Sequence, residues 1–324
     1  MRFRHRGFFF LVFFAILAGT FSATARAADE DRISILSGSA QFDFVVYGDI
    51  RFTDPADTRN SNPEARQALV QRIAELRPAF IMLTGDLVLR GGEESDWRIW
   101  EKETQPWRDT QVPVFPLIGN HELYGDPELA KYFAHFPELQ QRRWYTVRAG
   151  HVLFFVLDSS EDAPGGTQWS WLEGQLANIP SDVDFLFFTL HHPPYTRSSD
   201  SRAGHSARAA EQELAKMLER RQATTSARMV VLSGHVHNYE RYQHGNVTYI
   251  VSGGGGATPY VVPRTGNDAY QDPGPTYHFV HFFVEGRQLR AEMVKLESRN
   301  GKTRWFVRDS FQLQASAPAA AAAR

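Results

Sequence analysis

The protein has 324 residues, a formal net charge of −2, 42% hydrophobic residues and no cysteine. The slight acidity argues against nucleic acid as a partner, since proteins that follow a phosphate backbone carry a basic excess. The lack of cysteine excludes disulfides and thiolate metal sites, so any metal must be bound by His, Asp, Glu, Asn or Tyr.

The chain begins with a segment typical of a secretory signal peptide. Residues 1–27 combine a basic start, an apolar run from about Phe8 to Phe21, and small residues around Ala25 and Ala27. The alternative is an uncleaved membrane anchor, but the run is shorter than the ~20 residues that a helical span needs. We therefore expect export to the periplasm or beyond the cell. Cleavage would leave no stable membrane anchor and would move the formal charge from −2 to −6.

Apolar runs farther along the chain predict strands over 42–48, 79–85, 112–119, 151–158, 184–190, 228–234 and 247–253. Several are apolar almost throughout, which favours strands covered on both faces. Helical patterns over 62–78 and 207–221 lie between them. Late runs over 276–297 and 303–313 predict antiparallel strands. We expect one α/β domain of layered sandwich type over residues 40–313, followed by a disordered Ala-rich tail over 314–324.

Five predicted strands end in polar side chains that can bind metal. They are Asp49, Asp86, Asn120 with His121, His191 with His192, and His235 with His237. Ligands of open α/β sheets collect at the carboxyl ends of strands, so these groups can converge. Alone, each has a plainer reading, such as a turn after glycine, a solvated loop or a polar histidine pair. Their joint occurrence after successive strands favours a metal site.

The residue types indicate which metals fit. Oxygen ligands mixed with imidazoles suit Fe, Mn, Zn or Co rather than Ca or Mg alone. The set exceeds one tetrahedral site, which points to two metal ions that share a carboxylate, an arrangement suited to the hydrolysis of phosphate esters.

At these motifs the chain resembles the calcineurin-like metallophosphoesterases. The matching blocks are Gly-Asp at 85–86, GNHE at 119–122, HHPPY at 191–195 and GHVH at 234–237. The longer stretch GHVHNYERY, together with QWSWLEGQL at 168–176, is most similar to the purple acid phosphatase branch. The resemblance spans roughly Phe42 to Gly256. It implies a four-layer αββα sandwich of two mixed sheets flanked by helices, and hydrolysis of phosphate mono- or diesters by a metal-bound hydroxide.

The resemblance also implies a set of metal ligands. Asp86 would bridge the two ions. One ion would also take Asn120, His191 and His235, and the other would take Asp49 and His237. His192 would support the ligands without binding metal itself.

Two neighbouring residues gain catalytic roles from the same resemblance. His121 would lie over the phosphate, where it would stabilise developing charge or protonate the leaving oxygen. Glu122 would be the partner that orients His121.

The chain departs from the family at two positions. Arg51 stands where many members carry a histidine ligand, and Leu89 stands where the purple acid phosphatases supply a tyrosine. Arginine cannot ligate a metal, so we expect the Asp49/His237 site to bind its ion weakly. Arg51 would then hold a phosphate oxygen or replace missing positive charge; a structural ion pair is the alternative. Without the tyrosine, the protein should be colourless.

Other features carry less information. The stretch SGGGGATPY at 252–260 predicts a tight turn at the rim of the site, or backbone amides near a ligand. His205, His244, His278 and His281 have no motif context, so we expect surface or core histidines.

The leading hypothesis is a hydrolase of small phosphomonoesters. The alternatives are a phosphodiesterase on nucleotides or lipid head groups, and a non-catalytic descendant that binds metal or phosphate. The sequence indicates neither the physiological substrate nor the oligomeric state.

Overall fold

Two mixed β-sheets build the part of the chain that the computed structural model describes, namely residues 32–160, 164–198, 205–299 and 302–315. The expected signal segment, 1–27, and residues 316–324 of the expected tail lie outside these ranges. Residues from Ile33 onward form one unit by their contacts, and this unit is described below.

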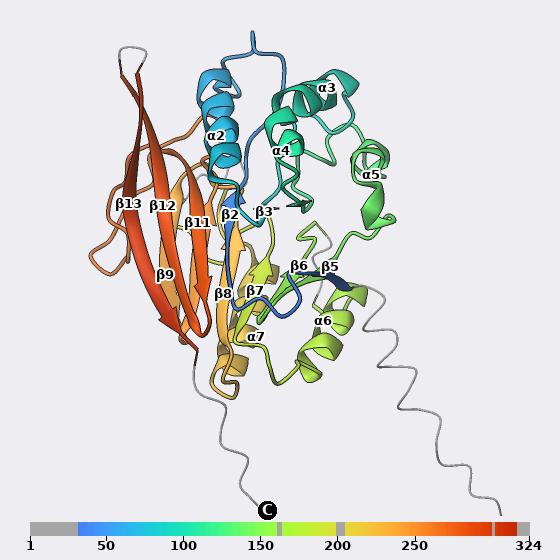
Figure 1. Ribbon diagram of the computed structural model, residues 1–324, viewed down its shortest axis with the longest axis vertical. Coiled ribbons are helices and arrows are strands. Elements are labelled where there is room, and N and C mark those ends of the chain that lie inside the picture. The colour runs from blue at the N-terminus through green and yellow to red at the C-terminus, as the bar shows by residue number, and fades with distance from the viewer. Residues whose placement is uncertain (1–31, 161–163, 199–204, 300–301, 316–324) are drawn as a thin grey trace, which may run out of the picture. The chain divides into compact units, whose positions relative to one another are not determined.

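The first sheet has seven strands in the order β1, β5, β6, β7, β8, β10 and β9 (Figure 1). Their bounds are β1 Arg32–Ile35, β5 Tyr145–Ala149, β6 Val152–Val156, β7 Phe185–Thr189, β8 Arg228–Ser233, β9 Tyr239–His244 and β10 Val247–Ser252. Strands β6, β7, β8 and β10 run parallel, whereas β5 and β9 pair antiparallel with their neighbours. Strand β1 precedes residue 40, where we expected the domain to begin.

The second sheet has six strands in the order β13, β12, β11, β2, β3 and β4. Their bounds are β2 Gln41–Tyr47, β3 Phe80–Leu83, β4 Val114–Phe115, β11 Tyr277–Glu285, β12 Gln288–Arg299 and β13 Lys302–Gln314. Strands β2, β3 and β4 are parallel, and β11, β12 and β13 are antiparallel, as predicted for the late runs.

The two sheets pack face to face through aromatic side chains. Phe44 of β2 meets Phe154 of β6 and Phe187 of β7 edge-on, with ring centroids 5.2 and 5.4 Å apart. Such T-shaped pairs are a favoured aromatic geometry. Alternate residues of a strand point to opposite faces, and the neighbouring Asp43 pairs with His281 of β11, with its Oδ2 atom 2.6 Å from His281 Nε2.

Helices cover the outer faces of the sheets (Figure 1). Helices α6 (Thr167–Ala177) and α7 (Ala209–Gln222) share a hydrophobic cluster with the seven-stranded sheet. Helix α4 (Gln105–Asp109) packs against β2, where its Trp107 meets Tyr47 edge-on, and helix α2 (Pro63–Leu76) lies against α4, β11 and β12. The remaining helices are α3 (Glu94–Glu103), α5 (Ala130–His135) and the 3₁₀-helix η1 (Pro137–Leu139). The predicted αββα sandwich is therefore confirmed.

Helix α2 fixes the segment that follows β2. Its first turn is capped by Asn62, whose side chain accepts a hydrogen bond from the Ala65 N–H group, with Pro63 as the first helical residue. The helix carries a fully buried arginine, Arg66, which pairs with Glu103 at 2.7 Å and donates to the backbone oxygen of Arg51 at 3.1 Å. This buried pair ties the Arg51 backbone to the helix.

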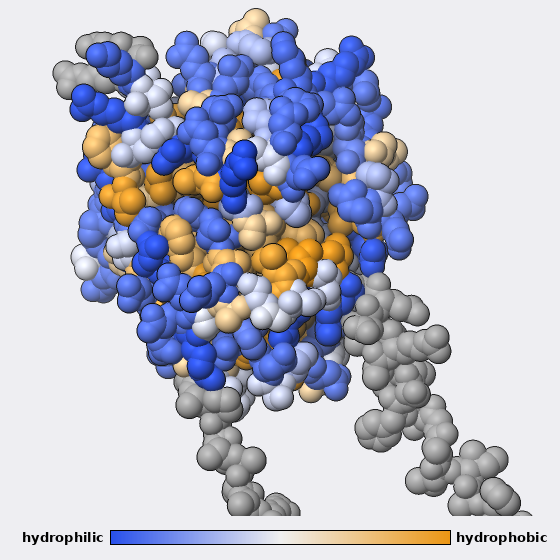
Figure 2. Space-filling view, in the orientation of Figure 1, coloured by the Kyte–Doolittle hydropathy of each residue, from blue (hydrophilic) through white to orange (hydrophobic). Residues whose placement is uncertain are grey.

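Polar residues cover most of the face seen in Figure 2, and hydrophobic residues gather near its middle. Three large hydrophobic side chains of the described residues are notably exposed: Tyr124 (64%), Val261 (64%) and Val307 (52%). Among the described helices, none has the length and apolar character needed to cross a membrane.

Candidate functional site

The two central carboxylates lie side by side because their strands do. Asp49 and Asp86 follow the parallel neighbours β2 and β3. Backbone hydrogen bonds continue past the strands, from Asp49 N–H to Gly85 oxygen (3.0 Å) and from Ile50 N–H to Asp86 oxygen (2.9 Å). Both aspartates have positive φ angles, 54° and 52°, as does His235 at 69°. Backbone strain of this kind is common at functional sites.

Gly85 allows the segments that follow the strands to approach one another closely. Its φ angle is +86°, and a Cβ atom there would lie 2.8 Å from Nδ1 of His191 and 2.9 Å from the backbone nitrogen of Gly119. Any side chain would therefore push apart the segments that carry the candidate ligands.

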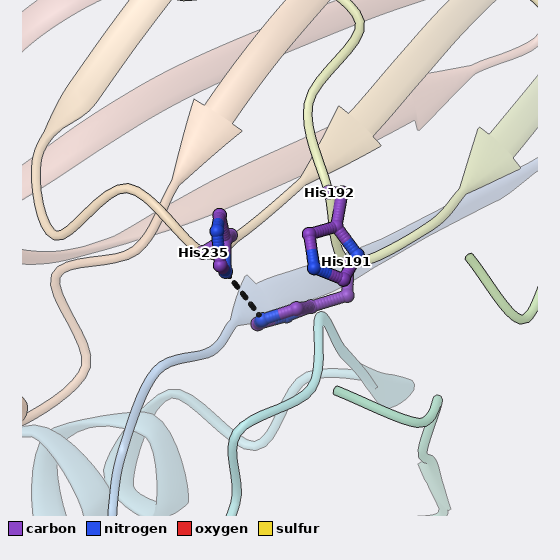
Figure 3. Close-up of side chains that lie close together, drawn as sticks. All are labelled: His191, His192 and His235. Atoms are coloured by element: carbon purple, nitrogen blue, oxygen red, sulfur yellow. Dashed lines mark hydrogen bonds between the residues drawn. The ribbon is translucent and has the colours of Figure 1, made fainter. Parts of the chain in front are cut away.

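One cluster contains Asn120, His191 and His235. The Asn120 Oδ1 atom lies 3.0 Å from both His191 Nε2 and His235 Nδ1, and these two nitrogens are 3.1 Å apart. Figure 3 shows the two imidazoles directed toward each other, with His192 beside them. Asp86 Oδ1 lies 3.3 Å from His191 Nε2, so one carboxylate oxygen reaches this cluster. These are the ligands expected for one ion.

A second cluster contains Asp49, Asp86 and His237, whose possible ligand atoms lie within 4.8 Å of one another. All three side chains are buried. The Nε2 atom of His237 is buried and has no hydrogen-bond partner among the described residues. A buried, unpaired nitrogen directed at two carboxylates fits a metal ligand.

Backbone carbonyls fix which nitrogen each histidine presents. Nδ1 of His191 lies 2.9 Å from the Thr84 oxygen, and Nδ1 of His237 lies 3.0 Å from the Thr258 oxygen. A carbonyl only accepts, so Nδ1 carries the proton in both rings. The Nε2 lone pairs therefore face the clusters, as in metal-binding histidines.

Electrostatics also favour cations at this place. Burial and the nearby Asp86 raise the pKa of Asp49 well above its usual range. Burial alone would raise the pKa of Asp86, but the neighbouring His191, His121 and Arg51 outweigh it and hold this pKa well below its usual range. Burial lowers the pKa of His191 and His237, which favours the neutral, metal-binding form. Two buried carboxylates need positive charge nearby.

His192 lies in the first cluster as well. Its possible ligand atom is within 4.8 Å of those of His191 and His235. Its Nδ1 atom lies 2.8 Å from the hydroxyl oxygen of Ser159, a residue that the sequence did not single out. Ser159 thus holds the ring that we expected to support the ligands.

His121 reaches the same carboxylate from the other side. Its backbone N–H group donates to Asp86 Oδ1 at 3.0 Å, and its Nε2 atom lies 3.8 Å from Asp86 Oδ2. Its Nδ1 atom lies 2.6 Å from the backbone oxygen of Leu89. His121 thus presents Nε2 to the centre, and Leu89 contributes its carbonyl group to that orientation.

The expectation that Glu122 orients His121 is wrong. Glu122 is fully buried, and its carboxylate accepts hydrogen bonds from several backbone N–H groups, including those of Asp86 (2.9 Å) and Gly119 (2.7 Å). Burial and Asp86 raise the pKa of Glu122 to about 8, while these N–H groups oppose the rise. A buried carboxylate needs several donors, which the strand-end backbone offers and a single imidazole does not.

Arg51 lies against the candidate bridging ligand. Its Nη2 atom is 3.4 Å from Asp86 Oδ2, so the ion pair that we considered as an alternative is present. Nη2 of the guanidinium thus pairs with Asp86, and its buried Nε–H group is left without a hydrogen-bond partner among the described residues.

The sequence missed two residues at this site, His205 and Tyr260. The His205 ring is buried, with its centroid 4.9 Å from that of His235 and 5.4 Å from that of His237. Tyr260 stacks on His205 at 5.2 Å. His205 sits in a loop without a short motif, so no local pattern marked it. Tyr260 ends the glycine-rich stretch that we expected at the rim.

The donor set fits two metal ions. It combines three imidazoles, an amide oxygen and two carboxylates, with Asp86 directed at both clusters. The fit rests on the unpaired Nε2 of His237 and on the two histidines whose Nδ1 atoms are held by carbonyls.

Comparison with known proteins gives a consistent picture. The model of the calcineurin-like phosphoesterase family matches residues 42–239. A 3',5'-cyclic-nucleotide phosphodiesterase from Nostoc sp. is 29% identical over 201 residues, covering 59% of this chain and 69% of that protein. Probable purple acid phosphatase 20 of Arabidopsis thaliana is 25% identical over 283 residues, covering 80% and 62%.

A purple acid phosphatase from yellow lupin (Lupinus luteus) seeds has a similar structure. The TM-score is 0.68 at 19% identity, and the match covers 87% of this chain and 55% of the lupin chain. This likeness shows the fold. The chain spans less than two thirds of the Arabidopsis and lupin proteins.

Proposed function

The chain belongs to the calcineurin-like phosphoesterase family, a family of phosphoric ester hydrolases, and we propose that it hydrolyses small phosphate monoesters at a centre of two metal ions. The observation that carries this proposal is the position of Asp86, whose oxygens face both donor clusters. We propose Asp86 as the bridging ligand. The other ligands would be Asn120, His191 and His235 for one ion, and Asp49 and His237 for the second.

Bound metals would supply positive charge to the phosphate oxygens and lower the pKa of a coordinated water. Fe, Mn, Zn and Co all suit this mixture of nitrogen and oxygen ligands. The second site has only Asp49 and His237 besides the shared Asp86, so we propose that it binds its ion more weakly.

We assign the acid chemistry to His121. The backbone oxygen of Leu89 accepts a hydrogen bond from Nδ1 of His121, so Nε2 of His121 is the nitrogen that would face the substrate. With both ring nitrogens protonated, Nε2 can donate a hydrogen bond to a phosphate oxygen or a proton to the leaving oxygen. The carboxylate of Glu122 acts indirectly, because it holds the backbone of the turn that carries His121.

We assign phosphate binding to Arg51. A planar guanidinium is suited to phosphate oxygens, and the unpaired Nε atom supplies a free donor beside the centre. Its pairing with Asp86 also offsets negative charge at the ligand that both ions would share.

A phosphodiesterase is the second candidate function, because the Nostoc relative is described as a cyclic-nucleotide phosphodiesterase. Exposed Tyr124, three residues after His121, and Val261, next to Tyr260, would suit an organic group beside the phosphate. A non-catalytic descendant that binds metal or phosphate without turnover is the third.

One experiment separates the three candidates. The mature protein is stripped of metal and reloaded, and hydrolysis of p-nitrophenyl phosphate, bis-p-nitrophenyl phosphate and 3',5'-cyclic AMP is followed at each metal-to-protein ratio. We expect the monoester to be the best substrate and its hydrolysis to rise until two ions are bound. A preference for the diesters would replace the monoesterase proposal, and no hydrolysis at any ratio would favour the binding protein.

The variant His121→Ala is the matched test of mechanism. We expect its turnover to fall by about 10²- to 10⁴-fold, the usual contribution of a positioned acid, with metal content unchanged. Turnover close to that of the wild type would remove His121 from the mechanism.

We also propose that the protein is exported, on the strength of residues 1–27. The test is expression in a bacterial host followed by N-terminal sequencing of the periplasmic fraction. A mature chain that begins near Ala28 is expected. An intact N-terminus in the membrane fraction would instead support an uncleaved anchor.

A further inference from the structure

Tyr260 joins three separate parts of the chain through one hydroxyl group. The oxygen lies 3.3 Å from the backbone nitrogen of His237 and 2.8 Å from Nδ1 of His205, and it forms a hydrogen bond with the side chain of Ser198. The ring also stacks on His205 with an angle of 13° between the planes. No family block of the sequence includes Tyr260.

The backbone of Tyr260 is fixed on both sides. Its N–H group donates to the His237 oxygen at 3.3 Å, and its own oxygen accepts from the Asn238 side chain at 2.6 Å. Just before it, Ala257 N–H donates to the Asp49 oxygen at 2.8 Å. The glycine-rich stretch therefore holds Tyr260 at a set distance from the candidate ligands.

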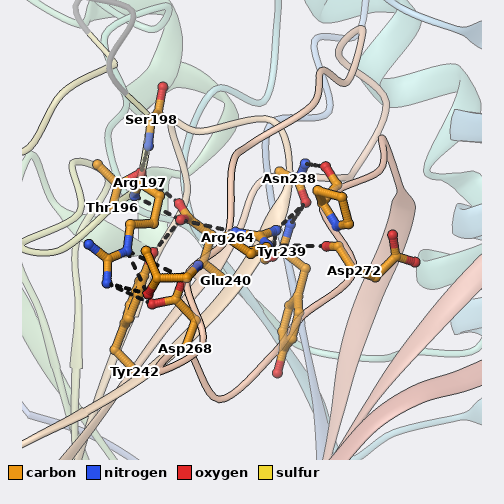
Figure 4. A network of polar contacts seen from close by, with 12 residues as sticks. Thr196, Arg197, Ser198, Asn238, Tyr239, Glu240, Tyr242, Arg264, Asp268 and Asp272 are labelled. Atoms are coloured by element: carbon orange, nitrogen blue, oxygen red, sulfur yellow. Dashed lines mark hydrogen bonds and ion pairs between the residues drawn. The ribbon is translucent and has the colours of Figure 1, made fainter.

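A buried polar network connects the loops behind the site (Figure 4). Glu240 is fully buried and accepts hydrogen bonds from Thr196 Oγ1 (2.6 Å), the Arg197 N–H group (2.9 Å) and Arg264 Nη1 (3.2 Å). Arg264 also donates to Asn238 Oδ1 at 3.1 Å. The loop that carries Ser198 is thus tied to the loop that carries Tyr260, so the hydroxyl has little freedom to move.

We propose that Tyr260 is a positioning residue: its hydroxyl group fixes Nδ1 of His205, so that the other ring nitrogen, Nε2, serves a phosphate group bound beside His235 and His237. This inference rests on the proposed function. Because Nδ1 is engaged by Tyr260, any hydrogen bond that His205 gives to a phosphate comes from Nε2. Stacking alone would fix the plane of the ring but not the nitrogen that it presents.

The variant Tyr260→Phe tests this directly, because it keeps the stacked ring and removes the hydroxyl. The binding of inorganic phosphate to the zinc-loaded protein is measured by titration calorimetry for the wild type, Tyr260→Phe, His205→Ala and the double variant. Zinc content is measured for each. Tyr249→Phe is the control, because its hydroxyl bonds Glu219 of α7 at 2.9 Å, away from the clusters.

We expect Tyr260→Phe to weaken phosphate binding by about 3- to 10-fold, the usual effect of one lost hydrogen bond, while zinc content and Tyr249→Phe remain at the wild-type level. His205→Ala should weaken binding at least as much. The double variant should be no weaker than His205→Ala, since Tyr260 acts through His205. With p-nitrophenyl phosphate, the loss should fall on KM more than on kcat.

Nitrogen-15 spectra of histidine-labelled, zinc-loaded protein give a readout independent of activity. The wild-type signal of His205 Nδ1 should show a hydrogen bond that is lost in Tyr260→Phe. Unchanged spectra and unchanged phosphate binding in Tyr260→Phe would overturn the proposal. So would additive losses in the double variant, or a loss of zinc from Tyr260→Phe. If the wild-type protein binds phosphate but hydrolyses no substrate, the proposed function is wrong. The phosphate affinities of the wild type and the variants would still test the role of Tyr260.

Discussion

Arg51 brings a permanent positive charge within 3.4 Å of the carboxylate that we propose as the bridge between two ions. The residue has a positive φ angle of 54°, and its backbone oxygen is held by buried Arg66. The guanidinium is therefore positioned by the fold rather than by the flexible side chain alone.

We predict that Arg51→Ala lowers turnover of p-nitrophenyl phosphate by about 10- to 100-fold, because a phosphate oxygen loses a charge-assisted hydrogen bond. Metal content by mass spectrometry is measured on the same samples. Arg51→Lys keeps the charge but not the planar fork, so it should recover only part of the activity. Unchanged turnover and unchanged metal content in Arg51→Ala would show that the residue is only a structural ion pair.

Single residues also show how far the sequence can be read. All six proposed ligands could be named from the sequence because each follows an apolar strand in a known order of motifs. The role of Glu122 could not, because its partners are backbone N–H groups, which every residue type supplies. His205 could not, because its position depends on a stack with Tyr260, which lies 55 residues away.

The turns at the strand ends are the elements on which the site depends. They hold the carboxylates and imidazoles in conformations that free strands would not adopt, and they fit together only where no side chain intervenes. Gly85 is the clearest case, since its neighbours would lie within 3.0 Å of a Cβ atom.

We predict that Gly85→Ala lowers the free energy of unfolding by roughly 1–3 kcal/mol, because the positive φ angle and the close contacts both become unfavourable. Gly174→Ala is a matched control, since Gly174 lies inside α6 and a Cβ there meets nothing within 4 Å. It should be neutral or stabilise by about 0.5–1 kcal/mol. Thermal unfolding measures both; equal effects would mean that the turn tolerates a side chain.

The sequence predicted most of the buried strands closely but did not predict the edge strand β9. Strands β2, β6, β7, β8 and β10 fall within a residue or two of the predicted runs because they are apolar almost throughout. Strand β9, with the sequence YERYQH, lies at the edge of its sheet, where charged side chains are tolerated, so its pattern did not indicate a strand. Short helices such as α4 and α5 depend on tertiary packing for their stability.

At the scale of the whole molecule, the centre joins the two sheets. Asp49 and Asp86 come from the six-stranded sheet, and His191 and His235 follow β7 and β8 of the seven-stranded sheet. Cations between them would therefore stabilise the packing of one sheet on the other.

We predict that treatment with EDTA lowers the thermal unfolding temperature by about 4 °C. A ligand whose free concentration is 100 times its dissociation constant adds about 2.7 kcal/mol to the free energy of unfolding, and in a chain of this length the loss of that energy corresponds to such a shift. The loss of metal leaves two buried carboxylates without compensating charge. Adding Zn²⁺ or Mn²⁺ should restore the value. The unfolding temperature of Asp86→Asn, which lacks the bridging carboxylate, should change much less on EDTA treatment. An equal change would mean that the stabilising ion binds elsewhere.

A second global property comes from His278 on β11, which lies 3.1 Å from Ser252 Oγ of β10 and so connects the two sheets. Burial lowers its pKa from 6.5 to about 4. The unfolded chain therefore takes up a proton at a higher pH than the folded chain does, and stability is lost as the pH falls from 6.5 toward 4.

We predict that His278 accounts for roughly 3 kcal/mol of the free energy of unfolding that is lost as the pH falls from 6.5 toward 4. His278→Gln cannot be protonated, so its free energy of unfolding should fall less steeply between pH 6.5 and 4. Urea unfolding at several pH values gives the comparison. Parallel curves for the two proteins would mean that other groups dominate.

The left-handed backbone at Asp49, Asp86 and His235 has a consequence for evolution. Each such conformation costs on the order of 1–3 kcal/mol in a residue other than glycine, so these positions are occupied at the expense of folding stability. A descendant released from selection for hydrolysis, but still required to fold, would gain stability by accepting glycine or asparagine there. Among sister sequences with the same sandwich, these three positions should thus change before the buried strands do, and they should distinguish active lineages from inactive ones.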